Sequence, residues 1–348
     1  MDVETANNIM NEVDVIIQSA ANTSMIERYD SLFEANVNGP QRLMRFAKRC
    51  NNLILFVHIS TAFVNGEREG VIPEKPMSMG ENRRKNVTSS MPQLDIANEM
   101  NIAFKSISTA STQLDTTIHS KKLGLERARF YGWSDAYQLT KAMGETIINE
   151  CKGDTPVLIV RPAIIESSYK EPFPGWIQGY RVTDPLIISY GKGHLPAFLG
   201  DAEVKLDIIP VDMVVNTIIA ATAKHGIRCR PGLDVYHSAS AIVNPLRYYD
   251  VFEFSYEYFS SNPLTESSSK GGNIKKIKFF DNINDLSKYT QDEICQSGGL
   301  QLDAMGTNAI ENLQKLQMKW KAKILHAIQL CKIYEFSGSY RGRYEYHT

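Results

Sequence analysis

Tyr137 and Lys141 stand four residues apart in the stretch YGWSDAYQLTKAMGE, residues 131–145. The surrounding residues favour a helix, and at this spacing both side chains lie on one helix face, about one turn apart. A free tyrosine has a pKa of about 10, and we expect the ammonium to favour the phenolate and lower that pKa. Such a phenol can protonate a carbonyl oxygen while a hydride reaches the carbon. With 16 tyrosines in the chain, one such pair can also arise by chance, so its context has to decide.

Two short, mostly apolar runs, residues 13–17 and 53–59, have the character of buried parallel strands, and the second is almost continuous. Small or hydroxyl-bearing residues follow them: Ala20, Ala21 and Asn22 after the first run, Ser60 and Thr61 after the second. Open parallel sheets bind ligands at the carboxyl ends of their strands. We therefore expect the hydroxyl of Thr61 to hold a carbonyl oxygen opposite Tyr137. For the first run, a plain exit from strand into loop explains the small residues equally well.

A parallel sheet is needed to position these groups. Residues 31–50 have a helical pattern and lie between the two apolar runs, and Gly39-Pro40 in their middle predicts a kink or break. Residues 155–165 predict another buried strand, which closes at Arg161-Pro162 because proline cannot continue the ladder. The order strand, helix, strand indicates an α/β fold with a parallel sheet and crossover helices.

Beyond this core, residues 206–223 predict a short strand and then a helix that begins near Pro210 and Asp212. Residues 234–240 predict one more short strand. The segment 171–185, EPFPGWIQGYRVTDP, is rich in proline, glycine and aromatic residues and follows a sheet edge. It fits a lid over a substrate or cofactor and, equally, a packed surface loop.

The C-terminal part has a different composition. Residues 262–273 are rich in Ser and Gly and predict a linker or surface loop. Residues 306–334 predict a long, basic amphipathic helix, which suits packing on its own domain and also suits a membrane surface. We expect a partial Rossmann-type catalytic domain over 1–262 and a helical domain over 263–348.

Composition excludes several classes of function. The chain has 348 residues, of which 43% are hydrophobic, and a formal net charge of -1, so nothing points to a nucleic-acid partner. The five cysteines and seven histidines are scattered, which argues against a disulfide framework or a metal site. The chain has neither a run of 18 apolar residues nor a basic, apolar leader, so we expect neither a membrane span nor a secretory signal.

Four separated blocks give these features a family context. HISTAFVNG (58–66), KKLGLERARFYGWSDAYQLTKAMGE (121–145), VRPAIIESSYKEPFPGWIQG (160–179) and LDIIPVDMVVNTIIAA (206–221) resemble the plant alcohol-forming fatty acyl-CoA reductases. These enzymes belong to the extended short-chain dehydrogenase/reductases. The resemblance is strong over about residues 10–262 and weaker to the end. It implies reduction of a long-chain acyl-CoA by NADPH, through an aldehyde, to a primary alcohol used for wax, suberin or pollen-wall lipids.

The resemblance also implies residue roles. Tyr137 would donate the proton, Lys141 would lower its pKa and hold the nicotinamide ribose, and Thr61 would steady the oxyanion. The remaining matched positions would lie around the cofactor: Ala20, Ala21, Asn22, Asn36 (which would also support the proton relay), Ser60, Arg161 and Pro162. The EPFPGWIQG loop would cap the acyl site. The family acts at the endoplasmic reticulum surface, in the cytoplasm or in a plastid, and peripheral membrane association is compatible with it; no partner protein is implied.

The sequence departs from the family at its start, because no Gly-rich phosphate-binding turn precedes Asp14. We therefore expect an incomplete Rossmann-like sheet that lacks its first strands and leaves an apolar edge on the first one. Three interpretations remain: an acyl-CoA reductase, a truncated and catalytically impaired reductase fragment, or another extended short-chain dehydrogenase such as a sugar-nucleotide epimerase. The blocks 121–145 and 160–179 argue against the epimerase.

Overall fold

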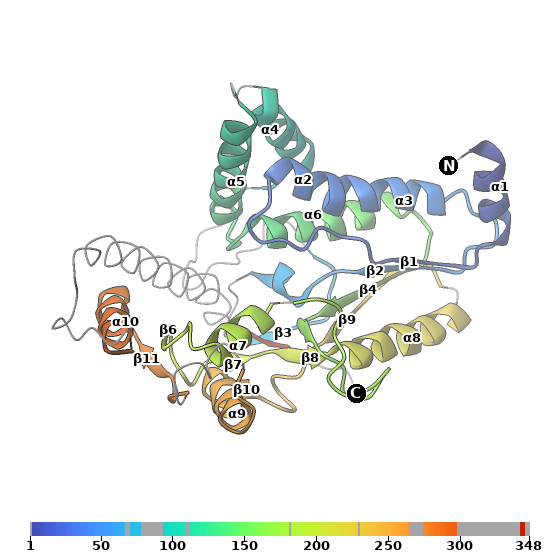
Figure 1. Cartoon of the computed structure of the whole chain (residues 1–348). Coiled ribbons are helices and arrows are strands. Elements are labelled where there is room, and N and C mark those ends of the chain that lie inside the picture. The colour runs from blue at the N-terminus through green and yellow to red at the C-terminus, as the bar shows by residue number, and fades with distance from the viewer. Residues whose placement is uncertain are drawn as a thin grey trace. The chain divides into compact units, whose positions relative to one another are not determined.

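The computed structural model describes residues 2–66, 70–77, 93–108, 112–180, 182–228, 230–264, 274–297 and 342–344 (Figure 1). Contacts between Cα atoms group them into two compact units. The first unit holds residues 2–176, 208–242 and 342–344, and the second holds 177–207 and 243–297. This grouping differs from the expected single boundary at 262, because the chain leaves the first unit after Trp176 and returns to it at Ile208.

A four-stranded parallel sheet with strand order β1-β2-β4-β9 forms the centre of the first unit. Its strands are β1 (Val15–Gln18), β2 (Leu55–Ile59), β4 (Val157–Pro162) and β9 (Leu233–Ser238). The predicted strands are thus present, and the predicted parallel α/β architecture is confirmed. Among the described residues β1 pairs only with β2, so it lies at one edge of this sheet.

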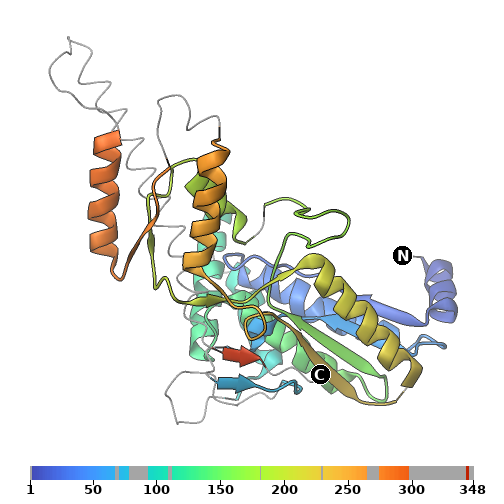
Figure 2. The same cartoon turned by 90° about the horizontal axis from the view of Figure 1, so that it is seen from below.

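Helices cover both faces of the sheet, as Figure 1 shows. Alternate residues of β2 explain why: Phe56 packs with α3 (Gly39–Ala47) and α6 (Ala136–Cys151), whereas Leu55 and Val57 pack with α8 (Val211–Arg228). These three β2 side chains are all buried, which explains the almost continuous apolar run in the sequence. Figure 2 shows α8, drawn in yellow, lying along its face of the sheet.

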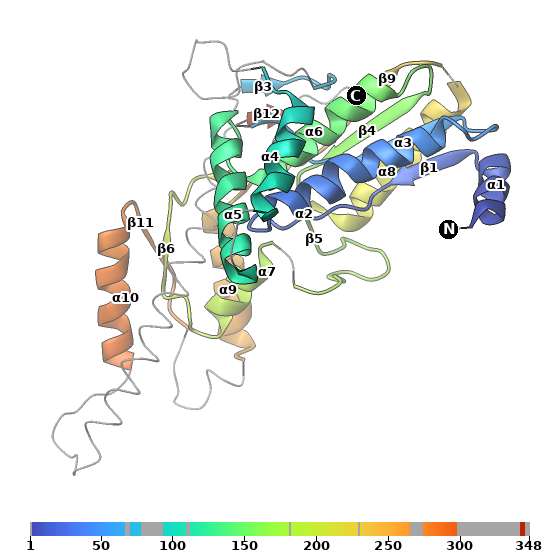
Figure 3. The same ribbon diagram turned by 90° about the horizontal axis from the view of Figure 1, so that it is seen from above.

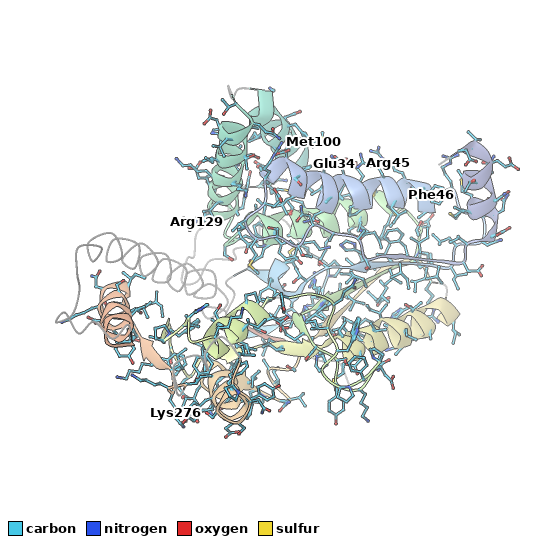
Figure 4. All side chains as sticks on the ribbon, viewed as in Figure 1. Glu34, Arg45, Phe46, Met100, Arg129 and Lys276 are labelled. Carbon is cyan, nitrogen blue, oxygen red and sulfur yellow. The ribbon has the colours of Figure 1, made fainter. Side chains whose placement is uncertain are left out.

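The helix predicted over residues 31–50 is a rod in three parts. It consists of α2 (Tyr29–Phe33), a π-helical turn η1 (Glu34–Asn38) and α3, which follow one another in line in Figure 3. Pro40 stands in the first turn of α3. Because proline has no N–H for the carbonyl four residues earlier, the helix widens before it instead of breaking at Gly39-Pro40. The charged Glu34 and Arg45 lie on the outer side of the rod (Figure 4).

Two helices precede α6: α4 (Ile96–Ser108) and α5 (Gln113–Phe130). The buried carboxylate of Glu99 connects this pair to the rest of the unit. It accepts hydrogen bonds from Arg127, from the Tyr29 hydroxyl at 3.0 Å and from the Tyr131 hydroxyl at 3.1 Å. Glu99 therefore ties α4 and α5 to α2 and to the turn that precedes α6.

The other elements of the first unit are short, apart from α1 (Val3–Glu12), which the sequence analysis did not predict and which Asp2 caps. They are the 3-10 turn η2 (Ala62–Asn65), β3 (Gly70–Ile72) paired with β12 (Gly342–Tyr344), and β5 (Ile164–Glu166) paired with β8 (Ile208–Pro210). The predicted strand 155–165 is therefore divided between β4 and β5.

The second unit has an aromatic core in which Phe198 contacts the rings of Tyr248, Phe252 and Phe279. Its elements are α7 (Asp184–Gly191), β6 (Ala197–Leu199) paired with β11 (Lys278–Phe280), β7 (Lys205–Leu206) paired with β10 (Leu246–Arg247), α9 (Tyr248–Ser261) and α10 (Ile283–Ser297). The predicted helix 306–334 and most of the predicted linker 262–273 lie outside the described residues. In the described part of the chain, no helix is long and apolar enough to span a membrane.

Candidate active site

Helix α6 carries the Tyr137–Lys141 pair and begins at a well-defined cap. The Asp135 carboxylate accepts a hydrogen bond from the Gln138 N–H at 2.9 Å, which satisfies a free donor of the first turn. Burial raises the pKa of Asp135 to about 6, and its hydrogen bonds with Gln138 and the Tyr137 N–H only partly oppose that rise. The predicted helix and the predicted side-by-side spacing of Tyr137 and Lys141 follow from this start.

Tyr137 contacts the residue that the sequence analysis placed opposite it. Burial raises the pKa of Tyr137 to about 12, and the neighbouring Thr61 side chain, which favours the phenolate, only partly opposes that rise. Thr61 lies just beyond β2, where its hydroxyl accepts from the Phe63 N–H at 3.4 Å and donates to the Pro162 carbonyl at 3.5 Å. The structure thus brings the ends of β2 and β4 together with the phenol of α6.

Lys141 is buried, and its ammonium donates to the backbone carbonyl of Ile59 at 2.8 Å. Burial lowers the pKa of Lys141 to about 8, although the charge of Glu145 opposes this. The expectation of a lowered pKa for Tyr137 is wrong for this structure, in which burial raises that pKa instead. The ammonium is engaged by the end of β2, and burial governs the phenol.

Asn36 lies in the π-helical turn and connects three elements of the site. Its side chain accepts from the Asn22 N–H at 2.9 Å and donates to the Asn22 carbonyl at 3.0 Å and to the Thr140 hydroxyl at 3.2 Å. The Asn36 carbonyl oxygen would be only 2.3 Å from a Cβ atom at position 144, so a side chain there would clash with it. Gly144 therefore allows the turn to approach α6 directly.

A buried ion pair lies one turn beyond Lys141. Arg161 donates to both carboxylate oxygens of Glu145, at 2.9 and 2.6 Å, and both side chains are 1% exposed. The guanidinium also lies 3.4 Å from Nε2 of His237, and together with burial its charge lowers the pKa of His237 to about 3. The sequence analysis placed Arg161 near the cofactor; in the structure its side chain holds α6 on β4, and its backbone lies near the end of β4.

His58, which is fully buried in β2, connects this strand to β1. Its Nδ1 lies 2.5 Å from the Gln18 side-chain oxygen, whereas Nε2 has no hydrogen-bond partner among the described residues. Burial lowers the pKa of His58 well below its usual value, and the charges of Lys141 and Arg161 act in the same direction. His58 is therefore neutral beside the buried cations Lys141 and Arg161.

Comparison with known proteins places the chain in a family. Residues 1–218 match the model of an NAD-binding family described as "Male sterility protein". The chain belongs to this family.

Relatives in the family are plant reductases. The chain is 42% identical over 350 residues to "Fatty acyl-CoA reductase 2, chloroplastic" of Arabidopsis thaliana, covering 99% of this chain and 57% of that one. It is 36% identical over 294 residues to "Alcohol-forming fatty acyl-CoA reductase" of Simmondsia chinensis, covering 83% and 58%. The chain thus spans somewhat more than half the length of these relatives. The predicted relationship to plant fatty acyl-CoA reductases is confirmed.

Solved structures agree on the fold. The terminal R domain from the myxalamid PKS-NRPS biosynthetic pathway superimposes with a TM-score of 0.52 at 15% identity, covering 96% of this chain and 59% of that one. At this identity the likeness concerns the fold alone, and it supports the Rossmann-like α/β architecture.

The strand ends suit the nicotinamide coenzyme of an NAD-binding family. Ala20 and Ala21 are exposed, and the Gln18 side chain fixes their segment by donating to the Ala20 carbonyl at 2.6 Å. At the end of β2, the buried Ser60 hydroxyl has no hydrogen-bond partner among the described residues. The small side chains leave the backbone accessible, and the Ser60 hydroxyl is available for a hydrogen bond. Both features suit a planar polar group at this edge of the sheet. Within the described residues, no three His, Cys, Asp or Glu are grouped to hold a metal.

Sequence reasoning missed Glu145, His58, Gln18 and His237 as members of this site. A signal existed for Glu145, which stands at the next helical position after Tyr137 and Lys141, so that all three share one face of α6. The histidines gave none, since a single polar residue inside an apolar strand does not reveal its partners.

Proposed function

We propose that this chain provides the catalytic centre of an NADPH-dependent fatty acyl-CoA reductase, which converts a long-chain acyl-CoA through an aldehyde into a primary alcohol. The observation that carries the proposal is the position of Thr61, just beyond β2, beside the phenol of Tyr137, with the Lys141 ammonium one helical turn away. The named activities of the plant relatives support the substrate class.

In this proposal Thr61 and Tyr137 act on the carbonyl oxygen of the substrate. Their hydroxyls come from different elements, the end of β2 and the first turn of α6, so both can donate to one oxygen between them. With a pKa of about 12, Tyr137 stays protonated at neutral pH, and it remains a stronger acid than the alcohol that forms when its proton reaches the alkoxide.

The coenzyme supplies a hydride to the carbonyl carbon in each of two reductions. In the first, the two hydroxyls stabilise the oxyanion until the carbon–sulfur bond breaks and coenzyme A leaves as its thiolate. In the second, the aldehyde oxygen takes the proton of Tyr137 and the alcohol results. Each cycle thus converts one thioester, two NADPH and two protons into one alcohol, one free thiol and two NADP⁺.

Lys141 has two proposed tasks. Its ammonium has further N–H donors besides the one that contacts Ile59, and these can hold the ribose of the coenzyme. Its positive charge, at a pKa of about 8, is present at neutral pH and favours the phenolate that forms when Tyr137 gives up its proton.

The remaining cofactor contacts are proposed at the strand ends: Ala20, Ala21 and Asn22 after β1, Ser60 after β2, and the backbone of Arg161 and Pro162 after β4. Asn36 would hold the first of these segments in place through Asn22, and support the proton relay beside α6. A place in wax, suberin or pollen-wall lipid synthesis follows from the proposed product. The chloroplastic relative favours a plastid over the endoplasmic reticulum surface or the cytoplasm.

The test is oxidation of NADPH by the purified chain with palmitoyl-CoA, compared with the Tyr137→Phe variant. Loss of the proton donor should lower the turnover number about 10²- to 10⁴-fold while the circular dichroism spectrum stays the same. A Tyr180→Phe variant, which removes an exposed phenol, is the control and should turn over normally. Turnover by Tyr137→Phe at the wild-type rate would show that the proton comes from another group.

A further inference from the structure

The loop of residues 168–176, which follows β5, is closed on itself within the first unit. The backbone of Ser168 donates to the Trp176 carbonyl at 2.8 Å and accepts from the Gly175 N–H at 2.9 Å. The Ser168 hydroxyl, on a buried side chain, donates to the Phe173 carbonyl at 2.6 Å. Gly175 has a φ of +82°, a conformation that favours glycine, so the loop returns through a turn that its sequence permits. Figure 3 shows this loop leaving β5.

Asp212, in the first turn of α8, fastens the outer half of this loop. Its carboxylate accepts three successive backbone N–H groups: Tyr169 at 2.8 Å, Lys170 at 2.8 Å and Glu171 at 3.1 Å. These bonds favour the ionised carboxylate and lower the pKa of Asp212 to about 2. The clamp is therefore present across the whole neutral range, and the pairing of β5 with β8 holds its two ends together.

Two aromatic side chains on the loop are exposed although the loop is well fastened. Tyr169 is 57% exposed and Phe173 58% exposed. Neither is needed to keep the loop closed, because the closing bonds come from the backbone, Ser168 and Asp212. Exposed rings on a preformed support offer apolar surface to a ligand without a cost for ordering the loop.

The loop also lies within reach of the reacting groups along the chain. Thr61 contacts the Pro162 carbonyl, and Ser168 follows Pro162 by six residues, which is at most about 22 Å of extended chain. An acyl chain that starts at Thr61 and Tyr137 needs an apolar wall at such a distance. We propose that Asp212 is a positioning residue that holds residues 168–176 as a fixed wall for the distal acyl chain, with Phe173 and Tyr169 as its contact surface.

This inference rests on the proposed function for its ligand, but it differs from a lid. A lid opens and orders on closing, whereas a loop clamped by Asp212 is ordered before substrate arrives. It predicts that the loop contributes to the binding of long chains and not to the chemistry at the carbonyl.

The first experiment measures order without activity. Amide hydrogen exchange is followed in the full chain for Tyr169, Lys170 and Glu171, in wild type, in Asp212→Ala and in Asp115→Ala. Asp115 is also a first-turn carboxylate, on α5, so its variant is the matched control. We expect protected amides in wild type and in Asp115→Ala, and exchange at least about tenfold faster in Asp212→Ala. Exchange in wild type at the rate of an unstructured peptide would overturn the clamp.

The second experiment measures binding by calorimetry, with palmitoyl-CoA and butyryl-CoA as probes. We expect Phe173→Ser and Asp212→Ala to weaken palmitoyl-CoA binding at least about fivefold and to leave butyryl-CoA binding within about twofold, and Asp212→Asn to lie between wild type and Asp212→Ala. Equal losses for both thioesters, or no loss for either, would overturn the wall. Chain-length discrimination without NADPH oxidation would support the wall and count against the proposed reductase, so the two failures are distinguishable.

Discussion

Breaking the buried ion pair between Glu145 and Arg161 should cost more stability than any other single change in the site. Each side chain is 1% exposed, and the two hydrogen bonds measure 2.9 and 2.6 Å. Glu145→Leu leaves a guanidinium in the core without a counter-charge, and Arg161→Met does the same to the carboxylate. Removing one partner of such a pair costs about 3–5 kcal/mol, a large share of the roughly 5–15 kcal/mol that stabilises a typical domain.

The double variant separates two explanations of the pair. Removing both charges together also removes the burial penalty, so Glu145→Leu with Arg161→Met should unfold within about 2 kcal/mol of wild type. The free energies of unfolding are measured by urea titration for wild type, both single variants and the double variant, and the coupling follows from the cycle. Glu126→Gln is the control, because Glu126 pairs with Lys122 on the surface of α5 at 3.8 Å and should change stability by less than about 0.5 kcal/mol.

Two results would refute this reasoning. Single variants that lose less than about 1 kcal/mol would show that water or another residue compensates the remaining charge. A double variant as unstable as the sum of the single ones would show that the pair contributes packing and no charge balance. A stable double variant with little NADPH oxidation would instead assign the pair to positioning α6, and through it Tyr137.

Three further predictions concern the groups around α6. Lys141 has a pKa of about 8 in the folded chain against 10.5 in the unfolded one, so NADPH oxidation should fall as pH rises through about 8. Between pH 8 and 10.5 the free energy of unfolding should rise, because only the unfolded chain still carries the proton; an activity profile flat to pH 10 would contradict the prediction. Asp135 has a pKa of about 6 in the folded chain against 3.8 in the unfolded one, so its ionisation destabilises the fold increasingly as pH rises from about 4 to 6. In thermal unfolding, Asp135→Asn, which keeps a capping side chain, should be more stable than wild type at pH 7 but not at pH 4. Gly144→Ala places a methyl group 2.3 Å from the Asn36 carbonyl and should cost about 1–3 kcal/mol in urea unfolding, whereas the control Gly226→Ala, whose methyl meets only Ile54 at 3.5 Å, should be neutral or stabilising.

Much of the fold could be predicted because its main signals are local. The almost continuous apolar run of β2 is typical of a strand that is buried on both faces, and the position of Pro162 marks the end of β4. The chain order of strands and helices then allows few topologies for a parallel sheet. What could not be predicted is how Gly39-Pro40 is accommodated, because a π-helical turn before the proline satisfies the helix as well as a break does.

The candidate site was predictable in its residue types and less so in its electrostatics. The spacing of Tyr137 and Lys141 placed them together on α6, and Thr61 was correctly set opposite the phenol. The direction of the Tyr137 pKa was wrong because it depends on burial, which comes from elements distant in sequence. The same limit applies to Arg161, whose partner Glu145 lies in a different element and is brought near only by the packing of α6 on β4.

The contact between the Lys141 ammonium and the Ile59 carbonyl has a practical consequence for protein engineering. A main-chain oxygen is present whatever amino acid occupies position 59, so the anchor of the lysine does not depend on that residue's identity. Residue 59 can therefore be varied to adjust the hydrophobic contacts with α8 while the hydrogen bond of the Lys141 ammonium is kept. The condition is that the pairing of residue 59 with Val160 of β4 is preserved.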